Sequence, residues 1–152
     1  MEAIKKEAFK IIGIKVRTTN ENGQGAKDIG GLWHKFMSEN SKDKIPNKID
    51  TSIIAAYTNY EDDYTKPYDT ILGCKVSSLD EIPNGMIGEE FEESKYLKFV
   101  SKGDLTAGIV YKTWTEIWSQ DLNRTYDVDF EVYGEKAQDP TNAEVAIFVG
   151  IR

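Results

Sequence analysis

Apolar residues recur with two different periods in the first part of the chain. Residues 8–18, AFKIIGIKVRT, have the period of two that predicts a β-strand, with one face made by Ala8, Lys10, Ile12, Ile14 and Val16. After a turn-rich stretch, residues 26–40 carry the apolar stripe of an amphipathic helix. That stripe comprises Ile29, Leu32, Trp33, Phe36 and Met37. Two strand-like runs, residues 51–61 and 68–78, come next, so this part reads strand, helix, strand, strand.

The same order returns in the second part of the chain. The segment LDEIPNGMIGEEFEES, residues 79–94, has the proline, glycine and acidic content of a connector. A strand at 95–103 and a helix at 105–121 follow, and the apolar stripe of that helix comprises Val110, Trp114, Ile117 and Trp118. Two more strands are predicted at 126–134 and 143–151. The pattern therefore predicts strand, helix, strand, strand a second time.

This recurrence indicates an internal duplication within one domain, residues 1–152. Aligning LWHKFMSEN with TWTEIWSQD pairs Trp33 with Trp114. The repeats are expected at about 6–79 and 95–152, joined by a connector at about 80–94. The predicted fold is α+β, a tandem duplication of strand-helix-strand-strand units with antiparallel sheets, two main helices and pseudo-twofold symmetry. Such halves bury little apolar surface alone, and pairing them leaves a cleft at their junction where a ligand can bind.

Charge and composition exclude several classes of function. The net charge of −7 argues against direct nucleic acid binding, which depends on Lys and Arg. One cysteine and one histidine, Cys74 and His34, exclude a disulfide within the chain and a thiol- or histidine-based metal site, so no metal and no cofactor are expected. The N-terminus lacks a signal peptide pattern and no apolar run could span a membrane, which predicts a cytoplasmic protein without membrane contact.

The strand RTYDVDFEVYG, residues 124–134, raises the question of function most directly. Strand alternation places Asp127, Asp129, Glu131 and Tyr133 on one face, opposite an apolar one. One interpretation is a solvated acidic face, the usual place for carboxylates in an antiparallel sheet. The other is the floor of a site that attracts positive charge. Three ionised carboxylates in one dry pocket would repel each other, so Asp127 and Asp129 are expected to reach solvent or to form a surface pair with Arg124 or Lys136.

Taken in order, these segments resemble a known family. The LW of the first helix, YTNYEDDYTKPYDTILG, IPNG, YLKFVSKG, TWTEIW, DFEVY and the terminal VAIFVGIR are similar to the GyrI-like effector-binding domains. These domains are ligand-binding modules of multidrug-responsive transcription regulators, and the pattern most resembles their stand-alone, integron-associated members. The resemblance covers residues from about Phe9 to Ile151.

The resemblance implies a site for small, lipophilic, cationic molecules. The family's pocket glutamate carries over onto Glu131, and its aromatic positions suggest the ligand-binding candidates Trp33, Tyr57, Tyr68, Trp114 and Trp118. The regulators attach this domain to a DNA-binding helix-turn-helix, for which no residues remain here. A protein partner that supplies DNA binding is therefore implied, with a role in drug sensing or transcription regulation.

Alternatives remain open for these residues. The tryptophans lie on helical apolar stripes and could be core residues, and the tyrosines that crowd residues 57–68 could pack across strands or form a stacking wall. Besides binding, Glu131 could act as the general base of a small-molecule hydrolase of the same superfamily, although no second acid is identifiable. A third hypothesis is a protein-binding inhibitor resembling the gyrase inhibitor, acting through Glu89, Glu90, Glu92 and Glu93. Binding is favoured over catalysis.

Overall fold

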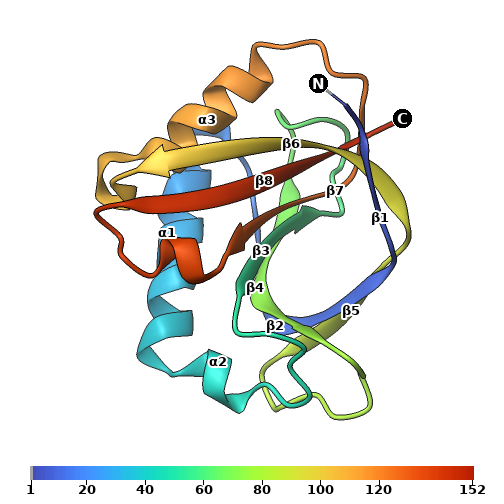
Figure 1. Ribbon diagram of the computed structural model, residues 1–152, viewed down its shortest axis with the longest axis vertical. Coiled ribbons are helices and arrows are strands. Elements are labelled where there is room, and N and C mark those ends of the chain that lie inside the picture. The colour runs from blue at the N-terminus through green and yellow to red at the C-terminus, as the bar shows by residue number, and fades with distance from the viewer. Residues whose placement is uncertain (1) are drawn as a thin grey trace.

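The computed structural model describes residues 2–152 as one antiparallel sheet with helices against it (Figure 1). The strands are β1 (Ile4–Lys6), β2 (Phe9–Thr18), β3 (Ile53–Thr58), β4 (Tyr68–Val76), β5 (Ile87–Phe91), β6 (Ser94–Gly103), β7 (Arg124–Tyr133) and β8 (Ala143–Ile151). The helices are α1 (Gln24–Ser38), the short α2 (Ser41–Lys44) and α3 (Ile109–Trp118). Single 3-10 turns are η1 (Glu21–Gly23), η2 (Leu105–Ala107) and η3 (Glu135–Ala137). The predicted α+β class is confirmed.

The strands follow an order that is symmetrical about the middle of the sheet. That order is β1-β6-β8-β7-β3-β4-β2-β5, and all neighbours are antiparallel. From the central pair, β3-β4-β2 runs outward on one side and β7-β8-β6 on the other. Each set of three strands is accompanied by one main helix, α1 or α3. This is the pseudo-twofold arrangement that the repeated pattern predicts.

The two ends of the sheet meet, so the sheet curls into a half-barrel (Figure 1). Only residues 7–8 separate β1 from β2, and only residues 92–93 separate β5 from β6. β1 pairs with β6, and β2 pairs with β5. The segment β1–β2 therefore runs alongside the segment β5–β6 in a single antiparallel register. The expected connector at 80–94 is not a loop throughout, since it contains strand β5. The Gly and Pro residues that suggested a loop lie mainly before this strand.

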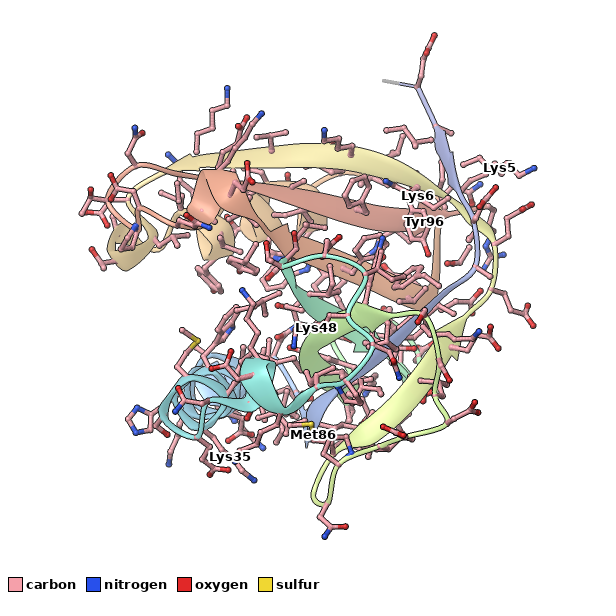
Figure 2. The ribbon with its side chains drawn as sticks, turned by 60° about the horizontal axis from the view of Figure 1, so that its bottom comes forward. Lys5, Lys6, Lys35, Lys48, Met86 and Tyr96 are labelled. Carbon is pink, nitrogen blue, oxygen red and sulfur yellow. The ribbon has the colours of Figure 1, made fainter. Side chains whose placement is uncertain are left out.

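Each face of the sheet buries its own apolar cluster. One cluster draws on all eight strands and on no helix, so it fills the inside of the curl; it includes the fully buried Tyr96, labelled in Figure 2. The other cluster lies between the sheet and the helices, where Leu32, Phe36 and Ile117 are buried. Met37 was expected in this second cluster, yet it is 60% exposed. Of the residues in the apolar stripe of α1, Met37 is rotated furthest around the helix axis from Leu32, so it lies at the edge of the stripe.

Strands β2 and β4 approach closely where two glycines face each other. Gly13 is the cross-strand partner of Gly73. A Cβ atom on Gly13 would lie 2.0 Å from the carbonyl oxygen of Leu72, and one on Gly73 would lie 2.1 Å from that of Ile12. Real Cβ atoms do not approach oxygen so closely, so only glycine fits both positions.

Within residues 2–152, no helix has the length and apolar character that crossing a membrane requires.

Candidate functional site

A cavity of about 230 Å³ lies between the two main helices and the sheet. Its wall contains residues of both halves of the chain, from α1 and β3 to α3 and β7. All six residues singled out from the sequence line it: Trp33, Tyr57, Tyr68, Trp114, Trp118 and Glu131. The other lining residues are Asn20, Gly25, Ala26, Ile29, Tyr60, Tyr64, Val110, Tyr111, Arg124 and Tyr133. The surface of this cavity is thus largely aromatic.

Glu131 is buried in the floor of this cavity, with 1% of its surface exposed. Its Oε2 atom accepts hydrogen bonds from the Tyr57 hydroxyl at 2.9 Å and from the Trp114 indole N–H at 2.6 Å. Its Oε1 atom accepts one from the Tyr133 hydroxyl at 2.7 Å. A solvated position on an open sheet face, which strand alternation alone would have allowed, is therefore excluded.

The register of the central strands explains how these donors converge. Glu131 pairs across the strands with Ala55, whose small side chain leaves room for the carboxylate. Tyr57 lies two residues after Ala55, and Tyr133 lies two residues after Glu131, so both project from the same face of the sheet. Because the strands are antiparallel, the two tyrosines flank Glu131 from opposite sides.

The aromatic rings that line the cavity, here called the aromatic wall, follow the same symmetry. The ring of Trp33 from α1 meets Tyr133 edge-on, with centroids 4.8 Å apart. The ring of Trp114 from α3 meets Tyr57 edge-on at 5.6 Å. The two tryptophans that the aligned helices pair in sequence thus occupy corresponding places on either side of Glu131. These two tryptophan–tyrosine pairs are arranged symmetrically, but only one carboxylate, that of Glu131, lies between them.

The surroundings of Glu131 act on its pKa in opposite directions. Burial raises the pKa of Glu131 above its usual value, and the hydrogen bonds from Trp114, Tyr133 and Tyr57 lower it, with burial the stronger effect. Burial also raises the pKa of Tyr57 and of Tyr133 well above the usual range, with the charge of Glu131 adding to it. Both tyrosines therefore stay protonated and donate to the carboxylate. Among residues 2–152, no lysine or arginine forms an ion pair with Glu131.

Asp129 is fully buried, which contradicts the expectation that it reaches solvent or a surface pair. Its carboxylate accepts hydrogen bonds from Arg124 at 2.6 Å, from the Tyr60 hydroxyl at 2.6 Å and from the Gly150 N–H at 2.8 Å. Of the two partners considered from the sequence, Arg124 and Lys136, Asp129 pairs with Arg124, and the pair is inside the protein. Asp127, in contrast, is exposed, as predicted.

An irregularity in β7 explains why this pair could form. In a regular strand, Arg124 and Asp129 would lie on opposite faces, because they are five positions apart and side chains alternate between the faces. The pairing of β7 with β8 shifts register between these two residues, and Tyr126 adopts a positive φ of 56°. This bulge brings both side chains to the cavity side of the sheet. The alternation assumed from the sequence does not hold through it.

Aromatic rings from the β3–β4 loop and from α3 contact each other in the cavity wall. Tyr64, in the β3–β4 loop, stacks on Trp118 with centroids 5.1 Å apart and planes 6° apart. Asn20 holds the region together, because its side-chain N–H donates to the Tyr64 carbonyl and its oxygen accepts from the Tyr68 hydroxyl. Tyr111 meets Trp118 edge-on and is 63% exposed.

Several cavity residues were missed as site candidates. Tyr60, Tyr64 and Tyr133 carried a signal, since tyrosines crowd residues 57–68 and Tyr133 shares the Glu131 face by alternation. Asn20 and Tyr111 carried none, because loop and helix-end positions have no period. Arg124 carried none because it precedes the register shift in β7, so alternation does not place it on the Glu131 face. His34, the one histidine, is exposed on α1. The part of the chain that the structure describes has no group of His, Cys, Asp or Glu side chains that could hold a metal ion.

Comparison with known proteins agrees with this architecture. The family model of integron-associated effector binding proteins matches residues 2–151. YobU of Bacillus subtilis, classed as a candidate transcriptional regulator, is 31% identical over 147 residues, which cover 94% of this chain and 92% of YobU. An integron cassette protein from the mobile metagenome of Vibrio cholerae is 29% identical, with a TM-score of 0.73 over 97% of this chain and 94% of that one.

More distant structures share the fold. SAV2435, solved bound to tetraphenylphosphonium, is 16% identical, with a TM-score of 0.80 over 99% of this chain and 93% of that one. This level of identity supports the fold alone. The family match and the YobU relationship, however, extend over nearly the whole chain. The chain thus belongs to the integron-associated effector-binding protein family, which is related to transcription regulators.

Proposed function

We propose that the cavity binds a small, lipophilic cation, with Glu131 as its counter-charge. The observation that carries this proposal is the buried carboxylate of Glu131, which has three hydrogen-bond donors but no cationic partner in the part of the chain described. The ligand would stack on Trp33, Tyr57, Tyr68, Trp114 and Trp118. A buried, fixed carboxylate attracts a cation more strongly than one in water.

The aromatic wall supports the same class of ligand. Aromatic faces attract cations by about 0.5–2 kcal/mol each, and they also accept apolar groups. The walls contain tyrosine and tryptophan from two helices, three strands and a loop, so a flat or branched apolar ligand would contact rings on several sides. A hydrophilic inorganic cation would gain little from these rings, because it would have to lose its water without apolar burial.

The family relationship supports a place for this binding in transcription regulation. Residues 1–152 would form a single effector-binding domain with two repeats, acting in the cytoplasm in drug sensing. The net charge of −7 makes direct DNA binding by this chain unfavourable, so a protein partner would supply it. The tetraphenylphosphonium bound to SAV2435 is a lipophilic cation, which is consistent with the proposed ligand class.

The contacts of Glu131 favour binding over general-base catalysis. A hydrolase needs a second group that protonates the leaving atom. The two hydroxyls next to Glu131, those of Tyr57 and Tyr133, both donate to its carboxylate. Since burial raises the pKa of both hydroxyls well above the usual range, they are poor proton donors to a substrate.

A pair of isosteric molecules tests the proposal. N-methyl-4-phenylpyridinium and 4-methylbiphenyl share the same shape and differ by one positive charge. We expect isothermal titration calorimetry to show the cation binding at least about tenfold more tightly than the neutral compound, because only the cation gains from Glu131. Equal binding of the two, or no binding of the cation, would overturn the proposed function.

Binding of the cation is also expected to depend on pH. Because the pKa of Glu131 is raised above its usual value, the carboxyl becomes neutral at a higher pH than an exposed glutamate does. Below this raised pKa, affinity for N-methyl-4-phenylpyridinium should fall by about tenfold per pH unit, since each binding event must release one proton. Above it, affinity should be constant. Burial raises the pKa of the neighbouring Tyr68 to about 12, and Tyr57, Tyr133 and Arg124 also keep their protons, so none of them titrates in this range.

The measurement is calorimetry at a series of pH values, with Glu131→Gln as the control. This variant has no carboxyl group to titrate at position 131, so its weak residual affinity should not follow the same curve. An affinity of the unchanged protein that is independent of pH down to the range of exposed carboxyls would contradict the raised pKa of Glu131.

A further inference from the structure

We propose that the cavity selects cations that carry a single positive charge, because the buried Arg124–Asp129 pair leaves Glu131 as its one uncompensated charge. This inference rests on the proposed function and adds a limit to it. It concerns two residues, Arg124 and Asp129, that do not contact Glu131 directly.

The charges around the cavity are few. Of its sixteen lining residues, only Arg124 and Glu131 have charged side chains; the others are aromatic, apolar, glycine or asparagine. The Arg124 side chain is 4% exposed, so water does not screen it. A cationic ligand would therefore meet one attractive charge and one repulsive charge in the same wall.

Asp129, which does not line the cavity, neutralises the charge of Arg124. The ion pair is 2.6 Å long, and the side chain of Asp129 is fully buried. The remaining contacts of Asp129 are neutral donors, the Tyr60 hydroxyl and the Gly150 N–H. The pair therefore contributes no net charge, but it keeps a fixed guanidinium close to the ligand space.

Arg124 and Glu131 both contact the ring system of Trp114. The guanidinium carbon lies 5.8 Å from the Trp114 ring centroid and 4.4 Å from that of Tyr126. The indole N–H of Trp114 donates to Glu131. A ligand that places one positive charge against Glu131 and stacks on Trp114 leaves no carboxylate for a second charge. That second charge would lie in an aromatic, water-poor space near the guanidinium, where repulsion and lost hydration both oppose binding.

A matched dication tests this inference. The dication 1,1'-dimethyl-4,4'-bipyridinium has nearly the shape of N-methyl-4-phenylpyridinium and one more positive charge. We expect calorimetry to show the monocation binding at least about tenfold more tightly than the dication, although the dication is attracted more strongly by a protein of negative net charge. Measuring both at two salt concentrations separates this long-range attraction from binding in the cavity.

Three variants assign the selectivity to the pair. Asp129→Asn leaves Arg124 uncompensated and should weaken monocation binding by about tenfold or more, with 4-methylbiphenyl unaffected. The double variant Arg124→Gln, Asp129→Asn removes both charges and should restore monocation binding. Arg124→Gln alone leaves two carboxylates and should improve the dication relative to the monocation. Asp127→Asn removes the same charge as Asp129→Asn at an exposed position and should change neither affinity.

The outcomes separate this inference from the proposed function. If the monocation binds better than 4-methylbiphenyl but the dication binds equally well, the inference is overturned and the proposed function stands. Monocation binding unchanged by Asp129→Asn would also overturn it. If neither cation binds, both fail together. Should Asp129→Asn not fold, as judged by its circular dichroism spectrum, the comparison of the two cations on the unchanged protein still decides the question.

Discussion

Replacing Glu131 with glutamine is expected to weaken N-methyl-4-phenylpyridinium binding about a hundredfold or more, because the counter-charge is buried and unscreened. The substitution should not disturb the cavity. The glutamine oxygen can accept from Tyr57 and Trp114 in place of Oε2, and its amide N–H can donate to the Tyr133 hydroxyl. Shape and hydrogen bonding are thus preserved while the charge is lost. Calorimetry on both proteins measures the difference.

The same variant should be more stable than the unchanged protein at neutral pH. The pKa of Glu131 is raised in the folded state, so its ionised form is less favourable there than in the unfolded chain. The stability from the neutral carboxyl is fully present below the unfolded-state pKa and is lost as pH rises through the folded-state pKa. Glutamine is neutral at every pH, and the gain in melting temperature should therefore appear at neutral pH and vanish in acid.

Asp127→Asn is the control for both measurements, since it removes one carboxylate at an exposed position. It should leave affinity and melting temperature nearly unchanged. Tight cation binding by the Glu131→Gln protein would show that the counter-charge lies elsewhere. A lower melting temperature of that protein at neutral pH would show that the ionised carboxylate stabilises the fold.

Gly13→Ala is expected to lower the free energy of unfolding by about 3 kcal/mol or to prevent folding. The new Cβ would lie 2.0 Å from the Leu72 carbonyl oxygen, so β2 and β4 would have to separate. The neighbouring residues cannot yield easily, because Ile12 and Leu72 are fully buried. Urea denaturation followed by circular dichroism measures the loss.

Gly30→Ala provides the matched control in a helix. No atom lies within 4 Å of a Cβ built at Gly30, and this residue is exposed on α1. Alanine should therefore raise stability there by about 0.5–1 kcal/mol, since glycine is the poorer helix former. Equal effects of the two substitutions would contradict the close approach of β2 and β4.

The sequence predicted the main helices and six of the strands because each has a clear period. Glu131 could also be singled out, since alternation in β7 and the family resemblance both pointed to it. The short strands β1 and β5 could not be predicted as the closure of the sheet. β1 pairs with β6 and β5 pairs with β2, which joins residues between 74 and 92 positions apart, and each of the two strands is too short to show a period. Residues 80–94 looked like a connector for that reason.

The burial of the Arg124–Asp129 pair could not be predicted, for a different physical reason. A bulge reverses which face of the sheet the following residues occupy. The alternation of apolar and polar residues around Tyr126 does not indicate this bulge. Three uncompensated carboxylates would repel each other in one pocket. The protein avoids this repulsion because Asp129 pairs with Arg124 inside the protein and Asp127 is exposed. The tyrosines of the β3–β4 loop were visible as a group, yet only the folded chain shows Tyr64 stacked on Trp118.

The placement of the tryptophans has an optical consequence. The chain contains three tryptophans, and all of them line the cavity. Light emitted on selective excitation of indole therefore comes only from the walls of the site, with no background from distant rings. Trp114 is the most sensitive of them, since its N–H donates to the carboxylate that would receive the ligand. Indole emission would thus report binding of the proposed ligand without any attached dye.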